Sequence, residues 1–357
     1  MHKKLFIPGP VDVRPEVLER MSEPMIGHRS KDASNLQRGI SDKLRKLFYT
    51  ENEILLSTTS GSGLMEGSIR SCTKKKAACF SVGAFGTRWY DMAVANNVPA
   101  DLYEAELGQP TTVEMVDKAL ATGEYDLITV THNETSTGIM NPVAEIGALL
   151  KEKYPEVIFC VDAVSSAAGY KIEVDAWGID VCVTSTQKAL GLPPGLAICT
   201  FSQKAYESAK QVKFRGFYLD LVKLYDTIQK KDYQYPSTPS LSHMNALDYQ
   251  LDCILAEGLD QRFARHAEMA DYVRAWAAKH FELFAPEGYR SNTVTAIKNT
   301  KEISVAGLNK DLARRGYAIS NGYGKMKEKT FRIAHMADYK LQDLQELLKQ
   351  IDDILGL

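Results

Sequence analysis

The chain has 357 residues, 45% of them hydrophobic, and its 43 basic residues nearly balance 45 acidic ones, for a net charge of -2. This length allows a large core domain with a smaller companion, and the ordinary apolar fraction excludes a disordered chain. There is no basic stripe for a nucleic acid, no apolar run long enough to span a membrane, and no signal-peptide core at the amino end. We therefore expect a cytoplasmic protein that binds neither nucleic acid nor membranes.

Strands and helices alternate from about residue 53 to residue 201. The clearest predicted strands are 53–57, 77–82, 126–131, 157–161 and 180–184, with helical stretches between them such as 143–154. This alternation predicts an α/β fold with a mostly parallel sheet covered by helices on both faces. Further along we predict a helical region over 241–281 that breaks near Gly258, strands around 293–297 and 330–336, and a last helix over 341–355.

A cluster of small residues, Thr58-Thr59-Ser60-Gly61-Ser62-Gly63, follows the predicted strand 53–57 and precedes an apolar, helix-like run. Free backbone N–H groups at the start of a helix, together with serine hydroxyls, can hold a phosphate. The alternative is a plain helix cap, because Ser/Gly clusters commonly precede helices.

The predicted strand 157–161 ends in a carboxylate, Asp162, and the predicted strand 180–184 leads to Lys188 in a Gly/Pro-rich turn. Since ligands of parallel sheets lie beyond the carboxyl ends of the strands, both groups should face one crevice. Burial lowers the pKa of a lysine and makes its amine a nucleophile. A pyridoxal phosphate enzyme needs this pair, a lysine for the aldehyde and an acid for the pyridine nitrogen. The alternative for Lys188 is a solvated loop lysine, and the alternative for Asp162 is a helix N-cap.

The segment Thr330-Phe331-Arg332-Ile333-Ala334 reads as a strand with a single arginine among apolar residues. An unpaired buried guanidinium is unfavourable, and bidentate binding of a substrate carboxylate resolves this problem. A structural salt bridge is the alternative.

The six cysteines are scattered without CxxC spacing, and we interpret them as reduced core residues. No metal site is predicted. The cysteines are Cys72, Cys79, Cys160, Cys182, Cys199 and Cys253.

Several motifs together resemble the class V aminotransferases, most closely the alanine-glyoxylate and serine-pyruvate group. They are Pro8-Gly9-Pro10, Ser60-Gly61-Ser62-Gly63, Thr131-His132-Asn133-Glu134-Thr135-Ser136-Thr137-Gly138, Val161-Asp162-Ala163-Val164-Ser165 and Ser185-Thr186-Gln187-Lys188-Ala189. The resemblance covers essentially the whole chain, with the motifs in the family's order. It implies the fold type I architecture, with a large domain over 16–255 and a small domain formed by 1–15 and 256–357.

The resemblance also implies roles for individual residues. Lys188 would hold the aldehyde of pyridoxal 5'-phosphate and Asp162 would pair with its ring nitrogen. Val164 and Phe85 would cover the two ring faces, with Phe85 where many relatives have tryptophan, and Thr135 would bind the 3-oxygen. Ser62, Gly63, Leu64 and Gln187 match phosphate contacts, Leu64 through its backbone only. Tyr235 and Thr238 match phosphate ligands that the family supplies from the partner subunit of a homodimer. The substrate-binding candidates are Arg332, Gly9 and Arg29.

Two assignments stay open at this stage. His28 and Arg29 fall in a segment that lies near the active site and dimer interface in relatives. Arg29 could meet a second substrate carboxylate, but we favour a role of both residues in tying subunits together. His132 could approach the cofactor or serve as a structural histidine.

The resemblance implies ping-pong transamination, from a small amino acid such as serine or alanine to a 2-oxo acid such as glyoxylate or pyruvate. A desulfurase or lyase of the same fold needs a nucleophilic cysteine before the carboxylate-binding arginine, and residues 320–328 contain none. A nicotinamide oxidoreductase is disfavoured because the Ser/Gly cluster lacks GxGxxG spacing. A non-enzymatic scaffold with the cofactor fold is the third alternative.

Overall fold

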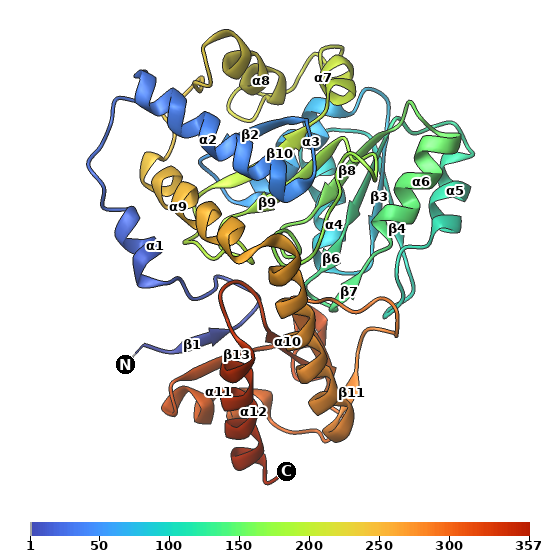
Figure 1. The fold of residues 1–357 in the computed structure, drawn as a ribbon. Coiled ribbons are helices and arrows are strands. Elements are labelled where there is room, and N and C mark those ends of the chain that lie inside the picture. Colours follow the sequence, from blue (N-terminus) through green and yellow to red (C-terminus); the bar gives the residue numbers. More distant parts are fainter. Residues whose placement is uncertain (1) are drawn as a thin grey trace.

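The fold is built on two sheets, which we describe from a computed structural model that covers residues 2–357 (Figure 1). The larger sheet has seven strands in the order β2-β10-β9-β8-β5-β3-β4. All pair in parallel except β10, which runs antiparallel to both neighbours. The strands are β2 (Glu53–Ser57), β3 (Ala77–Ser81), β4 (Ala100–Glu104), β5 (Leu127–Thr131), β8 (Ile158–Asp162), β9 (Val181–Ser185) and β10 (Ala197–Phe201).

Burial explains why these strands are visible in the sequence. Every residue of β2, β3, β5, β8, β9 and β10 is buried, as expected for strands covered on both faces, so each appears as a short continuous apolar run. The edge strand β4 is half-exposed and gave no such signal. The five strands predicted in this region are confirmed to within a residue or so at each end.

The reversed direction of β10 follows from the short link that precedes it. Residues 186–196 connect β9 to β10, which is too short for the helical crossover that a parallel neighbour requires. This link is the turn that carries Lys188. Lys188 therefore lies just beyond a buried strand because the chain reverses its direction there.

Helices surround the larger sheet and also pack on the smaller one (Figure 1). They are α1 (Pro15–Arg20), α2 (Lys31–Phe48), α3 (Gly61–Cys72), α4 (Ala84–Ala95), α5 (Val113–Leu120), α6 (Val143–Lys153), α7 (Gln203–Ala209), α8 (Leu221–Lys230), α9 (Leu241–Glu257), α10 (Leu259–His280), α11 (Val305–Arg314) and α12 (Leu341–Leu355). The predicted break between α9 and α10 is confirmed at Gly258, whose φ of 88° lies in the left-handed region that favours glycine. The predicted last helix matches α12.

The smaller sheet has five strands, one from the amino-terminal region and four from the last quarter of the chain. Its order is β1-β13-β14-β12-β11, and β1, near the amino end, pairs in parallel with β13. The strands are β1 (Lys4–Phe6), β11 (Glu282–Leu283), β12 (Val294–Lys298), β13 (Tyr317–Asn321) and β14 (Thr330–Ala334); a separate hairpin joins β6 (Asn133–Glu134) and β7 (Ile139–Met140). The domain division at residues 15/16 and 255/256 stays a prediction.

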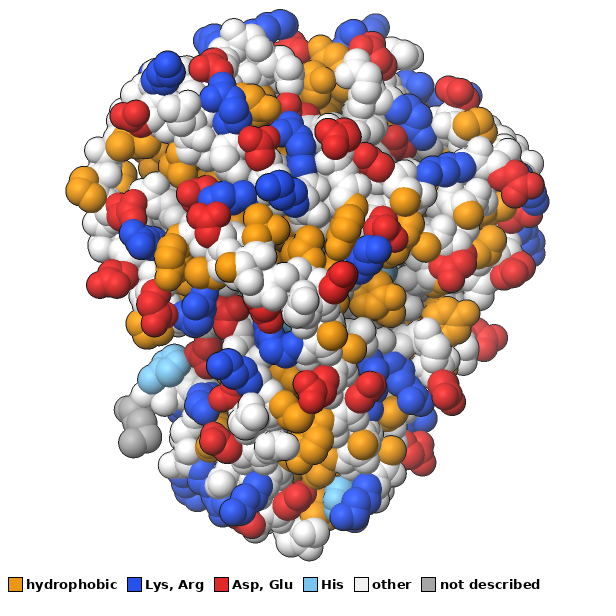
Figure 2. Space-filling model, viewed as in Figure 1, with side chains coloured by type: hydrophobic (Ala, Val, Ile, Leu, Met, Phe, Trp, Pro, Cys, Tyr) orange, Lys and Arg blue, Asp and Glu red, His pale blue; other side chains and the backbone are white. Residues whose placement is uncertain are grey.

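Surface and core agree with the composition. Lysine, arginine, aspartate and glutamate side chains are interspersed over the face shown in Figure 2. Five of the six cysteines are buried and all six are free thiols, with only Cys253 partly exposed. Within residues 2–357, no helix combines the length and apolar character needed to cross a membrane.

Candidate active site

A cavity of about 210 Å³ lies at the carboxyl ends of β8 and β9 and brings together residues from five separate segments. It contains seven of the predicted site residues: Ser62, Phe85, Thr135, Asp162, Val164, Gln187 and Lys188. The other lining residues are Ser60, Gly61, Met65, Arg88, Asn133 and Ser165. The predicted crevice between the two strand ends is therefore present.

Lys188 lies in the turn three residues beyond the end of β9. Its Nζ donates a hydrogen bond to the backbone carbonyl of Pro8. Burial lowers the pKa of Lys188 to about 8, opposed by the charge of Asp162 and reinforced by those of Arg332 and Arg88. A substantial fraction of this amine is thus neutral close to physiological pH, as a nucleophile requires.

Gly9 packs directly against the lysine. A Cβ atom at this position would lie 2.7 Å from Lys188 Nζ, and the φ of Gly9 is +121°. Any side chain would displace the amine. Gly9 therefore shapes the space around the nucleophile.

Asp162 is the last residue of β8 and is 4% exposed. Its Oδ1 accepts a hydrogen bond of 2.8 Å from the backbone N–H of Val164. No regular helix follows, so the N-cap interpretation does not apply. Burial raises the pKa of Asp162 to about 7; the Val164 N–H opposes this shift and the charge of Glu134 adds to it. A cationic N–H donor placed against this carboxyl would favour its ionised form.

The Ser/Gly cluster forms the start of α3. Ser60 is the N-cap residue, but its hydroxyl makes no capping hydrogen bond. The Gly63 amide donates to the carbonyl of Ser60 at 2.9 Å. The amides of Gly61 and Ser62 precede the first possible intrahelical bonds, so this helix start can bind an anion. Leu64 is fully buried in the core and offers no side-chain group to the cavity.

Arg88, on α4, is a cavity residue that sequence reasoning missed. Its Nη1 donates to Ser62 Oγ at 3.2 Å, and its Cζ lies 4.6 Å from the centre of the Phe85 ring. It forms no ion pair with any carboxylate in the described part of the chain. A cation next to the helix start strengthens the anion site. The motif Gly83-Ala84-Phe85-Gly86-Thr87-Arg88 contained this residue, but only its aromatic member was singled out.

Glu134, also missed, fixes the aromatic side of the cavity. This carboxylate is fully buried. Its Oε2 accepts hydrogen bonds of 3.0 Å from the backbone amides of Phe85 and Gly86, at the start of α4. Burial raises the pKa of Glu134, although these hydrogen bonds and those of Ser136 oppose the shift. An acidic residue among buried hydroxyl and apolar neighbours was the available signal in the sequence.

Thr135 and its neighbours form a hydroxyl-rich wall. Thr135 Oγ1 and Ser165 Oγ lie 3.2 Å apart, and Asn133 Nδ2 donates to Ser165 Oγ at 2.8 Å. The Asn133 Oδ1 atom is buried without a hydrogen-bond partner. An orphaned acceptor in a residue that lines a cavity fits a site that a ligand completes.

Arg332 lies in the middle of β14 and is 7% exposed. Its guanidinium donates to the backbone carbonyls of Thr135 (3.1 Å) and Asn321 (3.1 and 3.2 Å). Burial lowers its pKa, and the charge of Glu134 opposes that shift. Among residues 2–357 no carboxylate forms a salt bridge with it, so the salt-bridge alternative fails. A buried cation in this state is suited to a carboxylate ligand.

Seven predicted site residues do not line the cavity: Gly9, Gly63, Leu64 and Arg332, described above, and Tyr235, Thr238 and Arg29. The Tyr235 side chain is 5% exposed and its hydroxyl accepts a hydrogen bond from the Leu56 amide at 3.2 Å, which leaves its proton available for donation. The role of Tyr235 as a phosphate ligand for a partner stays a prediction. Thr238 is exposed beside it. Arg29 is exposed and donates to the backbone carbonyls of Tyr235 and Pro236, which anchors this segment within the chain.

The two ambiguous histidines are not in the cavity. His28 is half-buried beside Arg29. His132 is 2% exposed, with its Nδ1 3.0 Å from Ser166 Oγ and its ring edge-on to Tyr170 and Trp177. Burial lowers the pKa of His132 to about 4. The structure thus favours the structural role.

Comparison with known proteins identifies the family. The sequence pattern described as "Aminotransferase class-V" matches residues 18–346. The chain belongs to the class V aminotransferases. It is 40% identical, over 94% of this chain and 88% of the relative, to an uncharacterised aminotransferase of Methanocaldococcus jannaschii. It is 31% identical to a serine–glyoxylate aminotransferase of Arabidopsis thaliana, over 98% and 90% of the two chains.

The fold agrees with this family membership. The crystal structure of an alanine–glyoxylate aminotransferase from Nostoc sp. superposes with a TM-score of 0.93 at 26% identity, covering 99% of this chain and 96% of that one. The class V aminotransferase uses pyridoxal 5'-phosphate as its cofactor. The cavity fits this group, because it combines a nucleophilic lysine, a buried carboxyl, an anion-binding helix start and an orphaned acceptor.

Proposed function

We propose that this aminotransferase transfers the amino group of serine or alanine to a 2-oxo acid such as glyoxylate or pyruvate. The observation that carries the proposal is the shared cavity of Lys188 and Asp162, with the unpaired Arg332 bonded to the neighbouring Thr135. The names of the Arabidopsis and Nostoc relatives support serine, alanine and glyoxylate as substrates.

Bound pyridoxal phosphate supplies an aldehyde that carries the amino group and a ring that withdraws electrons from the donor's α-carbon. We assign its phosphate to Ser62, Gly63, Leu64 and Gln187, joined by Arg88, and its ring nitrogen to Asp162. Thr135 would bind its 3-oxygen, and Phe85 and Val164 would cover its ring faces. These assignments agree with the cavity lining for every residue except Gly63 and Leu64, which contribute only backbone at the helix start.

Four residues of the protein would each have a separate role in the reaction. The Arg332 guanidinium binds and orients the donor carboxylate, using donor directions that its carbonyl contacts leave open. Lys188 Nζ, with a pKa of about 8, would move the proton from the donor's α-carbon to the cofactor, so that the amino group stays on the cofactor when the oxo acid leaves. Asp162 holds a proton-bearing nitrogen at its carboxyl. Gly9 keeps the space around Nζ free of side chains.

A homodimer is part of the proposal. The aromatic residues Phe214 and Phe217 are 88% and 78% exposed, which is unusual for a surface in water. Tyr218 on the same segment lines a small pocket with Thr238. We propose that this surface meets a second copy and that Thr238 reaches the partner's phosphate site. The predicted cytoplasmic location and the role of Arg29 between subunits also stay predictions.

A half-reaction screen tests the proposed substrates. Serine or alanine added to the cofactor-loaded protein should abolish the visible absorbance of lysine-bound cofactor, and glyoxylate or pyruvate should restore it. Initial rates at several fixed acceptor concentrations should give parallel double-reciprocal lines. An intersecting pattern, or no spectral change with any small amino acid, would contradict the proposal.

A further inference from the structure

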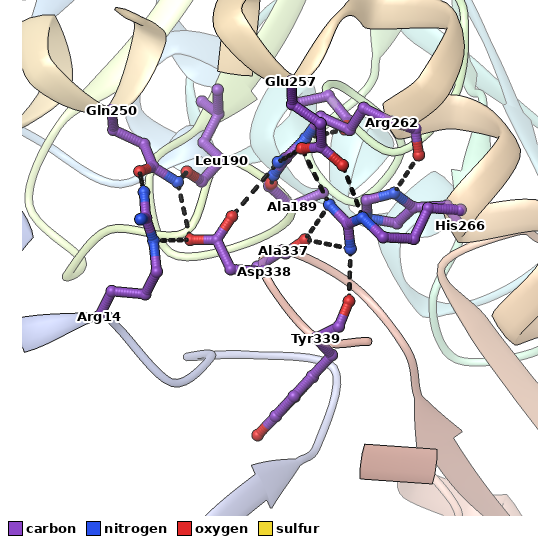
Figure 3. A network of polar contacts seen from close by, with 12 residues as sticks. Arg14, Ala189, Leu190, Gln250, Glu257, Arg262, His266, Ala337, Asp338 and Tyr339 are labelled. Carbon is purple, nitrogen blue, oxygen red and sulfur yellow. Dashed lines mark hydrogen bonds and ion pairs between the residues drawn. The ribbon is translucent and has the colours of Figure 1, made fainter. Parts of the chain in front are cut away.

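A buried polar network lies next to the turn that carries Lys188 and joins it to α9, α10 and the segment after β14 (Figure 3). At its centre is Arg262, on α10, which is 1% exposed. Its guanidinium donates to the carbonyls of Ala168 (2.9 Å) and Ala189 (2.8 Å). It also forms ion pairs with Glu257 (2.8 Å) and Asp338 (3.2 Å).

Three of these contacts fall on segments that carry the proposed site groups. Ala189 directly follows Lys188. Ala168 lies six positions after Asp162, and Asp338 lies six positions after Arg332. One planar group with fixed donor directions therefore touches the backbone or side chain of all three segments.

The remaining members of the network hold the same turn. Gln250 Nε2 donates to the Leu190 carbonyl at 2.9 Å and to Asp338 Oδ2 at 3.0 Å. Arg14 Nε donates to the same Asp338 oxygen at 2.8 Å. A Cβ atom at Gly191 would lie 2.9 Å from Gln250 Nε2 and 3.2 Å from Asp338 Oδ2. The turn is therefore in direct contact with the network.

The two carboxyl groups of the network, Asp338 and Glu257, favour their ionised forms. Burial opposes ionisation of Asp338, but the charge of Arg262, a hydrogen bond from Gln250 and the charge of Arg14 outweigh it and hold its pKa below the ordinary value. Burial likewise opposes ionisation of Glu257, and hydrogen bonding from Arg265 with the charge of Arg262 outweighs it. Both carboxyl groups therefore favour the ionised form that these ion pairs require.

We infer that Arg262 is a positioning residue of the transamination site, which fixes the segments of Lys188, Asp162 and Arg332 relative to one another. The inference rests on the roles proposed above for those three residues. A lysine at position 262 keeps the charge, but its single ammonium cannot reach the Ala168 and Ala189 carbonyls in the fixed geometry of a guanidinium.

Arg265 provides a matched control. It belongs to the same network and pairs with Glu257 at 2.6 Å, but its carbonyl contacts, Ala337 and Tyr339, flank Asp338 in the segment after β14. It does not contact the Lys188 turn or the loop after Asp162. The substitutions Arg262→Lys and Arg265→Lys therefore make the same chemical change within one network, and only the first releases the two carbonyls beside the site.

The first readout is kinetic. In the cofactor-loaded full chain, Arg262→Lys should lower kcat/KM for alanine and glyoxylate by about 100-fold, the effect expected from a displacement of about 1 Å at the reacting groups. Arg265→Lys loosens only the segment after β14, so any loss should be several-fold at most and confined to KM, with kcat within about threefold of the natural enzyme. Equal losses in the two variants would overturn the inference.

The second readout is the ionisation of Lys188 in the full chain freed of cofactor, followed by pulse acetylation at a series of pH values and mass spectrometry of its peptide. The charged groups that act on Lys188 are Asp162 from β8, Arg88 from α4 and Arg332 from β14, and neither substitution changes them. In Arg262→Lys, the loosened turn should let water reach the amine and raise the pH midpoint of Lys188 acetylation by about one unit. In Arg265→Lys this midpoint should not shift. An unshifted midpoint in both would reduce Arg262 to a scaffold role.

A third variant covers the case in which Arg262→Lys folds poorly. Asp338→Asn keeps the Ala168 and Ala189 contacts and weakens the link to the segment of Arg332. It should raise KM for the amino donor several-fold and leave the Lys188 midpoint in place, whereas a shifted midpoint with unchanged KM would contradict the inference. If the natural protein shows no transamination but Arg262→Lys still shifts the midpoint, the proposed function fails and the positioning role stands.

Discussion

Two buried arginines near the active site differ in how their charges are met. Arg262 is 1% exposed and pairs with two carboxylates, Glu257 and Asp338, in addition to two carbonyls. Arg332 is 7% exposed and bonds only to the carbonyls of Thr135 and Asn321. Removing a charge from water is unfavourable unless a partner compensates it. We therefore expect the compensated arginine, Arg262, to hold the segments around the site in place, and the uncompensated one, Arg332, to bind a ligand.

The same contrast extends to the lysines. Lys204 is paired with Asp180 at 2.8 Å and donates to two backbone carbonyls. Lys188 donates to a single carbonyl, has no ion pair in the described chain, and has a lowered pKa. We therefore expect function in this protein to be located where buried or half-buried charges lack a partner within the described chain.

The largest expected effect comes from the unpaired lysine. Lys188→Arg keeps the positive charge but provides no neutral amine at working pH, so amino transfer should fall by about 10⁴-fold. The visible absorbance of lysine-bound cofactor should disappear as well. Stopped-flow spectra of one turnover with alanine measure both.

Lys204→Arg is the control for that experiment, because Lys204, on α7, has an ion-pair partner. It should keep its ion pair with Asp180 and retain activity within about threefold. If the two lysine variants lost activity equally, the distinction between paired and unpaired charges would fail.

The two arginines should separate stability from activity. Arg332→Gln removes a charge that has no counter-ion, so the free energy of unfolding should fall by less than about 1 kcal/mol, while kcat/KM for the amino donor falls by about 10²- to 10³-fold. Arg262→Met leaves Glu257 and Asp338 short of a partner and should lower the free energy of unfolding by about 3–5 kcal/mol. Urea denaturation together with donor kinetics tests this. A large loss of stability in Arg332→Gln would show that its charge is compensated after all.

The sequence predicted the parts of this structure that depend on local pattern. Strands buried on both faces appear as apolar runs, and Asp162 and Lys188 were found because each follows such a run. The break at Gly258 and the bounds of α12 were equally local signals. The family was identified from motifs, which the comparisons confirm.

The parts that the sequence did not predict depend on contacts between distant segments. Arg262 bonds to Ala168, 94 positions away, and nothing in the pattern of α10 distinguishes this arginine from a surface one. Glu134 reaches the amides of α4, 48 and 49 positions before it. The hydrogen bond between the Leu56 amide and the Tyr235 hydroxyl could not be predicted either, because a motif gives the residue type but not the contacts of its side chain.

Buried histidines differ from the buried arginines because burial keeps their side chains neutral. Burial lowers the pKa of His132 to about 4 and that of His335 to about 3, the latter helped by the charge of Arg274. A depressed folded pKa contributes stability that is fully present above the unfolded value of about 6.5 and is lost as pH falls toward the folded value. Each imidazole should therefore lower the free energy of unfolding by about 2 kcal/mol between pH 6.5 and pH 5.

Urea denaturation across this pH range checks the prediction, and His335→Gln serves as the test variant. The His335 Nε2 lies 2.9 Å from Thr295 Oγ1 and its Nδ1 lies 3.1 Å from the Asn292 carbonyl, contacts that glutamine can partly replace without titrating. The variant should show a shallower acid slope. An unchanged slope would mean that other groups cause the acid loss.

The smallest expected effect concerns Phe85, which lines the cavity and which we propose stacks on the cofactor ring. Its backbone is held by Glu134 and its ring lies under the Arg88 guanidinium, so Phe85→Leu should remove ring stacking while leaving the backbone in place. An aromatic contact of this kind contributes about 0.5–1.5 kcal/mol, equivalent to about a 3- to 10-fold weaker affinity for pyridoxal phosphate. Phe284→Leu, outside the cavity, should leave this affinity unchanged. Equilibrium dialysis measures the affinity of both variants for pyridoxal phosphate. A loss in Phe85→Leu alone would show that an uncharged side chain of the cavity also binds the ligand, whereas equal affinities would contradict the stacking role of Phe85.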